Sequence, residues 1–302
     1  MKRILVTGAG GQVGQELQTC LTPLGEVMGL GRQVLDLAHP EQIRQTIHKL
    51  QPDVIVNAAA YTAVDQAEAE LDQAIAVNAT ATQVLAEAAE RLGAFFIHIS
   101  TDYVFDGTRS HPYVETDATN PLGAYGKSKL MGEMAIALST SDYAILRTAW
   151  VYGSYGKSNF VKTMLRLGAN REEIRVVADQ IGSPTWAKDL AQAIAQFIPH
   201  ASPETTGIYH YTNSGVASWY DFAVAIFEEA AELGFPLKVQ RVVPITTAEY
   251  PTPARRPAYS VLSCAKIAGV LGTYPPHWRQ GLRRMLAELY AQTHESAHSL
   301  RG

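Results

Sequence analysis

Tyr125 and Lys129 are the two side chains whose types and spacing indicate chemistry most directly. They stand four positions apart in Tyr-Gly-Lys-Ser-Lys, so a helix would carry both on one face, about one turn apart. A tyrosine with an ordinary pKa of about 10 is a poor acid or base at neutral pH, but a nearby ammonium lowers that pKa. The pair is therefore predicted to pass a proton, although an amphipathic helix with a solvated lysine has the same spacing.

Thr101 lies where an apolar run over residues 95–100 ends. That run predicts a parallel strand, and ligands of open α/β sheets bind at the carboxyl ends of the strands. We expect Thr101 to hydrogen-bond a substrate carbonyl while Tyr125 donates a proton and a hydride arrives from a nicotinamide. The alternative is that Thr101 is an ordinary turn residue at the end of a strand.

Gly8, Gly11 and Gly14 follow the first apolar run and open a helical pattern. Glycine lets a backbone turn sharply and approach a pyrophosphate, and a helix N-terminus supplies free N–H groups. Glycines also simply make tight turns, but the strand-turn-helix context favours dinucleotide binding. The second strand ends without the acid that would bind the ribose of NAD, whereas Arg32 is available for the 2′-phosphate of NADPH, unless it lies in a solvated loop. NADPH is therefore favoured over NADH.

The elements that must position these residues follow from the hydrophobic pattern. Short apolar runs alternate with helical stretches, which predicts an α/β, doubly wound, Rossmann-like parallel sheet. The expected strands are 2–7, 26–30, 54–57, 95–100 and 143–149, and the expected helices are 12–21, 40–50, 72–92 and 125–137.

After about residue 150 the pattern changes to helices at 160–167, 188–197 and 218–233, joined by longer connections, with an irregular Pro-rich stretch over 244–257. We predict a dinucleotide-binding domain over 1–150 and a smaller α/β substrate-binding lobe over 151–302. A strand near 207–212 is able to rejoin the main sheet.

Composition excludes several classes of protein. The chain has 302 residues, a net charge of −4 and two cysteines, so neither nucleic acid nor a membrane is expected as a partner, and neither a disulfide framework nor a cysteine-ligated zinc site is indicated. No apolar run is long enough for a signal peptide or a membrane helix, which favours the cytoplasm. His98 is read as a core histidine, and His39, His48 and His111 show no metal spacing. The cluster Arg279, Arg283 and Arg284 is read as the solvated face of the last helix.

Six stretches together resemble the extended short-chain dehydrogenase/reductase family, along nearly the whole chain. They are residues 11–14, 57–65, 100–107, 125–129, 147–152 and 250–257. The resemblance implies an enzyme that moves a hydride from NADPH or NADH to a keto group of a sugar carried on a nucleotide. It makes Thr101, Tyr125 and Lys129 the catalytic triad.

The resemblance, with the glycine turn and Arg32, also gives two binding sets. The cofactor set is Gly8, Gly11, Gln12, Val13, Gly14, Arg32, Asp36, Leu37, Ala60, Tyr61, Thr62, Tyr125 and Lys129. The substrate set is Ser100, Thr101, Tyr103, Tyr125, Trp150 and Arg256. Trp150 would pack against the sugar or, alternatively, in the core, and Arg256 would neutralise the diphosphate or cap a Pro-rich loop.

Some members of the family dimerise around a magnesium ion held by glutamates. Glu16 and Glu288 match that set, but Lys188 stands where a third acid is expected, and an ammonium cannot ligate a hard cation. No metal is therefore predicted, and the chain is expected to be a monomer or a homodimer.

Two other functions remain open. A nucleotide-sugar dehydratase or epimerase shares the fold, but the related dehydratases use an acidic pair directly after the threonine, whereas here Asp102 is followed by Tyr103. A regulatory subunit, similar to the partner of methionine adenosyltransferase that resembles these reductases, would keep nucleotide binding without catalysis. The intact Thr101, Tyr125 and Lys129 set argues against that reading.

Overall fold

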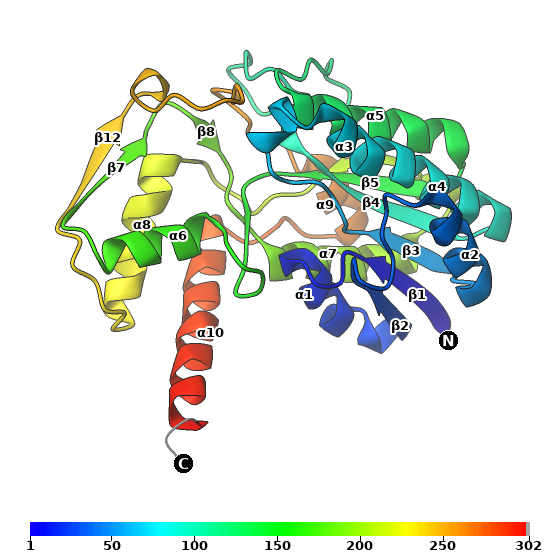
Figure 1. Cartoon of the computed structure of the whole chain (residues 1–302), viewed down its shortest axis with the longest axis horizontal. Helices are drawn as coiled ribbons and strands as arrows, with labels where there is room; N and C mark the ends of the chain where they lie inside the picture. The colour runs from blue at the N-terminus through cyan, green and yellow to red at the C-terminus, as the bar shows by residue number, and fades with distance from the viewer. Residues whose placement is uncertain (300–302) are drawn as a thin grey trace.

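A six-stranded parallel sheet forms the centre of the molecule (Figure 1). The structure, a computed structural model, describes residues 1–299, with side-chain burial described to residue 293. The strand order is β10-β5-β4-β3-β1-β2. The strands are β1 (Lys2–Thr7), β2 (Gly25–Leu30), β3 (Val54–Asn57), β4 (Phe95–Thr101), β5 (Tyr143–Thr148) and β10 (Gly207–His210). The predicted doubly wound α/β fold is confirmed.

Helices cover both faces of this sheet. One face packs against α1 (Gln12–Cys20), α7 (Ala187–Phe197) and α9 (Ala265–Leu271). The other packs against α2 (Pro40–Leu50), α4 (Ala81–Leu92) and α5 (Ala124–Ser139). Strands buried on both faces need apolar side chains in both directions, which explains why their sequences are continuous apolar runs rather than alternating ones.

The register of the strands brings polar residues to one edge. Thr7 of β1 pairs with Asn57 of β3, and Asn57 pairs with His98 of β4. On the other side of β4, Thr101 pairs with Thr148 of β5. The carboxyl ends of four strands therefore meet where ligands of open α/β sheets bind.

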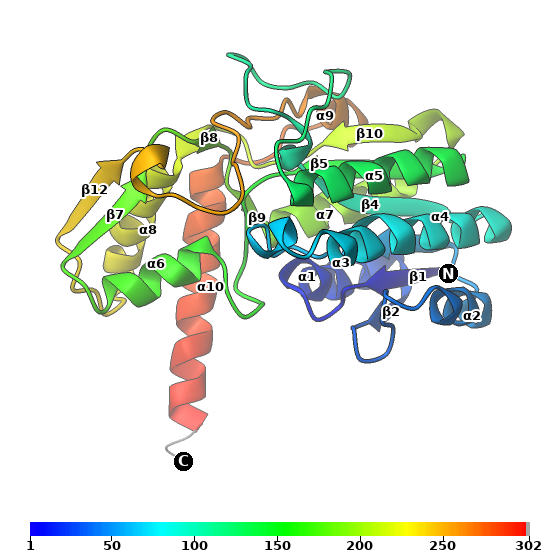
Figure 2. The same ribbon diagram turned by 45° about the horizontal axis from the view of Figure 1, so that its top comes forward.

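A smaller lobe lies beside this edge (Figure 2). Its helices are α6 (Phe160–Gly168), α8 (Trp219–Glu232) and α10 (Trp278–Ser299), and they share a core around Phe222 and Leu282. Its strands form three pairs: β7 (Glu173–Val177) with β12 (Arg241–Ile245), β6 (Val151–Tyr152) with β9 (Thr185–Trp186), and β8 (Ile181–Gly182) with β11 (Ala217–Ser218).

The chain passes between the two parts repeatedly. After β6 and α6 in the lobe, α7 returns to the sheet and packs Leu190, Ile194 and Phe197 into its core. β10 then adds the edge strand beside β5, as the pattern over 207–212 allowed. The part of the chain after residue 150 thus contributes to the sheet as well as to the lobe.

Two local expectations need refinement. The helix expected over 72–92 is present, but it has three parts: α3 (Leu71–Ile75), a π-helical turn over Ala76–Thr80, and then α4. Asn78 in this turn points its amide at the backbone of Tyr61, with its Oδ1 2.8 Å from the Tyr61 nitrogen, so the extra residue secures the loop after β3. Pro244 was expected in an irregular stretch but lies within β12, where a two-stranded pair leaves an unpaired edge that tolerates proline.

The three arginines of the last helix lie on an exposed face, as expected, and they also have partners on neighbouring helices. Arg279 and Arg283 both form ion pairs with the buried Glu229 of α8, and Arg284 pairs with the buried Asp189 of α7. These arginines therefore tie α10 to its neighbours. Within residues 1–299, no helix is both long and apolar enough to cross a membrane.

Candidate active site

A cavity of about 840 Å³ extends along the carboxyl edge of the sheet and reaches the lobe. It brings together most residues of the two predicted sets: Gly8, Gly11, Gln12, Val13, Arg32, Asp36, Leu37, Ala60, Tyr61, Thr62, Ser100, Thr101, Tyr103, Tyr125, Lys129 and Trp150. Gly14 and Arg256 are the two predicted residues that do not line it.

The glycine turn is built as tightly as its sequence indicates. Gly8 has φ +68°, a left-handed conformation that favours glycine, and its carbonyl accepts a hydrogen bond of 2.9 Å from the nitrogen of Gly11. A Cβ on Gly14 would lie 2.1 Å from that same carbonyl oxygen, so Gly14 acts by letting α1 approach the turn. Gly11 is the N-cap of α1 and no side chain caps the helix, which leaves N–H groups of its first turn available to an anion.

Thr101 and Tyr125 meet at the centre of the cavity. Thr101 ends β4, and Tyr125 lies in the first turn of α5, where its ring contacts the edge of the Tyr103 ring with centroids 5.6 Å apart. Burial raises the pKa of Tyr125 to about 12, although a hydrogen bond with Thr101 opposes the rise. The expected lowering of this pKa by Lys129 is therefore wrong for the chain without its ligands, and the phenol is protonated at neutral pH.

Lys129 is directed to β4 rather than to Tyr125. Its Nζ donates to the carbonyl oxygen of Ile99 over 2.7 Å and lies 2.9 Å from Nε2 of His98. Burial lowers the pKa of Lys129 to about 7, against the opposing charge of Glu133. His98, read from the sequence as a core histidine, is indeed fully buried, but one of its nitrogens contacts the predicted catalytic lysine.

Asp102 adds a buried carboxyl group beside Thr101. The Thr101 hydroxyl donates to Oδ1 of Asp102 over 3.1 Å, while Oδ2 has no hydrogen-bond partner among the described residues. Burial raises the pKa of Asp102 to about 6, with nearby hydroxyl groups opposing the rise. Because Asp102 also lines the cavity, it belongs to the site although sequence reasoning used it only to compare enzyme classes.

Trp150 lies at the end of the cavity that faces the lobe. Its backbone has φ +49°, which is strained for a residue other than glycine, and its ring is stacked on Trp219 with centroids 3.5 Å apart. The stack covers one face of the Trp150 ring, and the expected packing of Trp150 against a sugar stays a prediction. Trp219, Phe160 and Asn159 of the lobe also line the cavity, and no pattern in the sequence distinguished them from core residues.

Arg256 does not line the cavity, and its predicted contact with a diphosphate stays a prediction. Its guanidinium forms an ion pair of 2.9 Å with Asp65 and also donates to the Thr252 hydroxyl and the Ala254 carbonyl. This is the arrangement of a structural cap for the Pro-rich loop, the alternative left open above. The sequence did not indicate this pairing, because Asp65 is far from Arg256 in sequence but adjacent in the fold.

The set matched to a magnesium site is an ion-pair cluster in this chain. Lys188 Nζ lies 2.9 Å from a carboxylate oxygen of Glu288, and burial together with the nearby Glu288 raises the pKa of Glu16 to about 7. Within the described residues, no group of three His, Cys, Asp or Glu side chains is placed to hold a metal ion.

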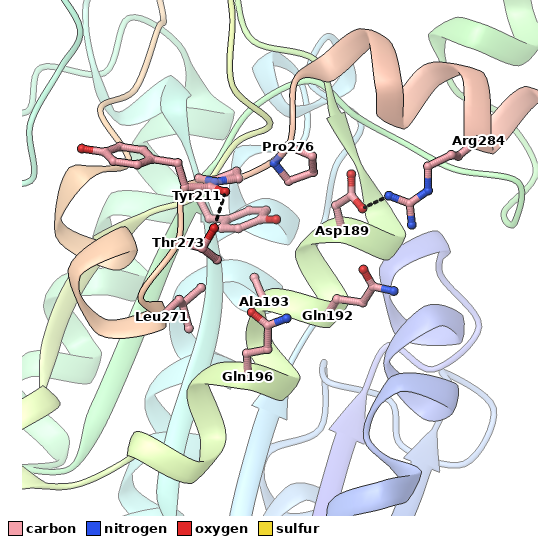
Figure 3. A pocket seen from close by; sticks show the side chains of 11 residues that line it. Asp189, Gln192, Ala193, Gln196, Tyr211, Leu271, Thr273, Pro276 and Arg284 are labelled. Atoms are coloured by element: carbon pink, nitrogen blue, oxygen red, sulfur yellow. Dashed lines mark hydrogen bonds and ion pairs between the residues drawn. The ribbon is translucent and has the colours of Figure 1, made fainter.

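A second, smaller cavity of about 120 Å³ lies between α7 and the segment that leads into α10. Figure 3 shows Asp189 and Arg284 bonded to each other at its edge. Its volume is too small for a nucleotide, and the charged groups at its edge already have partners. The larger cavity is therefore the candidate site.

Known proteins were compared with this sequence and structure. The family model described as the RmlD substrate binding domain matches residues 1–291. A dTDP-4-dehydrorhamnose reductase of Burkholderia thailandensis is 49% identical over 298 residues, covering 96% of this chain and 100% of that protein.

Solved structures give the same result. The crystal structure of dTDP-4-dehydrorhamnose reductase from Bacillus anthracis in complex with NADP has a TM-score of 0.88 and 41% identity, covering 95% of this chain and 99% of that one. A UDP-glucose 4-epimerase of Thermus thermophilus, at 20% identity and TM-score 0.78 with 96% and 99% covered, shares the fold alone. The chain therefore belongs to the family of the RmlD substrate binding domain, together with the dTDP-4-dehydrorhamnose reductases that it resembles over its length.

Proposed function

We propose that the chain reduces the C4 keto group of dTDP-4-dehydro-L-rhamnose to give dTDP-L-rhamnose, with NADPH as the reductant. The observation that carries the proposal is the meeting of Thr101, Tyr125 and Lys129 in one cavity with the glycine turn. The relatives named above, at high identity over the whole length, give the substrate.

The cavity fits a dinucleotide along the sheet edge. The uncapped N-terminus of α1 is available for the pyrophosphate, and the exposed Arg32 at the far end is available for a 2′-phosphate. The crystallised Bacillus anthracis relative holds NADP, which agrees with the preference inferred from Arg32. When bound, the cofactor supplies the hydride that adds to the carbonyl carbon.

The proton comes from the chain. Tyr125 is protonated at neutral pH because its pKa is raised to about 12, so it can donate its proton to the carbonyl oxygen as negative charge develops there. The Thr101 hydroxyl, which shares a hydrogen bond with Tyr125, is placed to orient the same oxygen. The charge of Lys129 in its protonated form stabilises the tyrosinate that remains.

The lobe supplies the surface for the sugar. Trp150, Trp219 and Phe160 form an aromatic wall at the end of the cavity that faces the lobe. We propose that the deoxysugar, whose methyl group and ring carbons are apolar, packs against this wall. The cytoplasmic location, the oligomeric state and the division of roles among the lining residues stay predictions.

The proposal is tested by following NADPH oxidation at the absorbance of the reduced nicotinamide, with dTDP-4-dehydrorhamnose generated in the same tube. Tyr125→Phe is expected to lower kcat by about a hundredfold or more while NADPH still binds, because only the donated proton is removed. Tyr152→Phe is the matched control, since that buried hydroxyl lies outside the cavity and donates to the Trp278 carbonyl oxygen.

Three outcomes separate the alternatives. Sugar-dependent oxidation that is lost in Tyr125→Phe and kept in Tyr152→Phe supports the reductase. Tight NADPH binding without turnover by the wild type would move the assignment to a regulatory subunit. Turnover with a different nucleotide-linked keto-sugar only would place the chain elsewhere among the reductases of this fold.

A further inference from the structure

A chain of buried hydrogen bonds connects the glycine-turn strand to Lys129. The Thr7 hydroxyl donates to Oδ1 of Asn57 over 2.6 Å, and Nδ2 of Asn57 lies 3.0 Å from Nδ1 of His98. His98 in turn has Nε2 2.9 Å from Lys129 Nζ. All four side chains are at most 1% exposed, so water does not compete for these bonds.

The direction of each bond follows from the donors available. Because Oδ1 of Asn57 accepts from Thr7, its amide nitrogen faces both the Thr82 hydroxyl and the imidazole, and Nδ1 of His98 must accept. A neutral imidazole then carries its hydrogen on Nε2, directed at Lys129. Burial is the main effect that lowers the pKa of His98, and it keeps the ring neutral whether or not Lys129 is charged. An amine that accepts from Nε2–H must itself be neutral.

The surrounding charges agree with this arrangement. Burial lowers the pKa of Lys129 to about 7, and Glu133, one turn further along α5, opposes that effect. Glu133 itself forms an ion pair of 2.6 Å with Arg147 of β5 and accepts a hydrogen bond of 2.5 Å from the Ser100 hydroxyl. These partners largely neutralise its negative charge. Among the described residues, the imidazole is hydrogen-bonded to Asn57 and Lys129, and not to Tyr125 or Asp102, the other titratable groups nearby.

We propose that His98 is a positioning residue for Lys129: its Nε2–H fixes the lysine amine against the end of β4 and favours the neutral amine in the enzyme without its ligands. The kinetic part of this inference rests on the proposed function, in which the amine must gain a proton to stabilise the tyrosinate. The structural part concerns the tautomer of His98 and the titration of Lys129, and neither requires turnover.

Two substitutions of His98 distinguish the roles of its two ring nitrogens. Glutamine carries its amide nitrogen near the place of Nε2, so His98→Gln keeps a donor to Lys129 and loses the contact with Asn57. Asparagine reaches only as far as Nδ1, so His98→Asn keeps the contact with Asn57 and loses Lys129. The two variants are polar and similar in size, and a role in filling the core would affect both alike.

The titration of Lys129 is measured by NMR on the whole chain with lysine labelled by ¹³C at the ε-carbon, with Lys129→Arg used to assign the signal. In His98→Asn the midpoint is expected to move to higher pH by about half a unit or more, because a donor to the neutral amine is lost. In His98→Gln it is expected to stay near that of the wild type. In the reductase assay, kcat is expected to fall about tenfold in His98→Asn, because the amine is no longer held against the end of β4 and this loss outweighs the larger protonated fraction; the fall should be much smaller in His98→Gln.

An unchanged midpoint in His98→Asn, or equal effects in both variants, would overturn the inference. If either variant does not fold, ¹⁵N spectra of the wild-type imidazole still decide, since a hydrogen found on Nδ1 rather than on Nε2 contradicts the proposal. Absence of sugar-dependent turnover by the wild type would remove the proposed function and leave both NMR measurements interpretable.

Discussion

Gly14 offers a test of how tightly the phosphate-binding turn is built. A Cβ at this position would lie 2.1 Å from the Gly8 carbonyl oxygen, whereas ordinary contact begins at 3.4 Å. The difference, 3.4 − 2.1 = 1.3 Å, is the distance by which α1 and the turn must separate in Gly14→Ala. Overpacking on this scale costs about 1–3 kcal/mol. The displacement also misplaces the N–H groups meant for the pyrophosphate, so NADPH binding should weaken about tenfold or more.

Gly269 provides the matched control. It also lies within a helix, α9, but an added Cβ would meet no atom within 4 Å. Gly269→Ala should therefore stabilise the chain by about 0.5–1 kcal/mol through helix propensity and leave NADPH binding unchanged.

Urea unfolding gives the stabilities, and titration of NADPH followed by its fluorescence gives the affinities. Gly14→Ala is expected to shift both measurements, and Gly269→Ala only the first, in the opposite direction. The reasoning would be refuted by a Gly14→Ala protein that is as stable as the wild type and binds NADPH as tightly.

Three further predictions concern charge. Burial lowers the pKa of Lys129 from 10.5 to about 7 in the folded chain. The cost of burying the charged amine is therefore fully present below about pH 7 and is relieved as pH rises toward 10.5. The free energy of unfolding in urea should rise over this window by up to about 1.4 kcal/mol per pH unit, and by less in Lys129→Met. An equal slope in both proteins would contradict the lowered pKa. Glu133→Gln leaves the buried guanidinium of Arg147 without its negatively charged partner, and the free energy of unfolding should fall by about 3–5 kcal/mol in the same assay. The double variant Glu133→Leu with Arg147→Met should recover most of that stability. Arg32→Ala should raise KM for NADPH about tenfold or more with little change for NADH, and a parallel change for both cofactors would remove Arg32 from the 2′-phosphate site.

Much of the sheet could be predicted because its signals are local. The strands over 2–7 and 54–57 have the same bounds in the structure, since a strand buried on both faces must be apolar along its length. The glycine turn and the Tyr125 to Lys129 spacing are local for the same reason. Each concerns residues within one turn or one helix, where sequence distance and spatial distance agree.

The partners of the site residues could not be predicted, because they depend on register and on contacts distant in sequence. Lys129 was expected to face Tyr125, but the pairing of β3, β4 and α5 places His98 beside it instead. Arg256 finds Asp65, which lies 191 positions earlier. Trp219 begins a helix of ordinary sequence and reaches the cavity only through the packing of the lobe.

The return of α7 and β10 to the sheet has a consequence for how this architecture can be divided. The first 150 residues alone would lack an edge strand beside β5 and the helix whose Leu190, Ile194 and Phe197 cover one face of the core. A fragment cut there would expose that apolar face and an unpaired strand, the two features that lead to aggregation. The sheet and the lobe therefore cannot be separated by one cut near residue 150, and an exchange of the lobe between related proteins would have to keep α7 and β10 with the sheet.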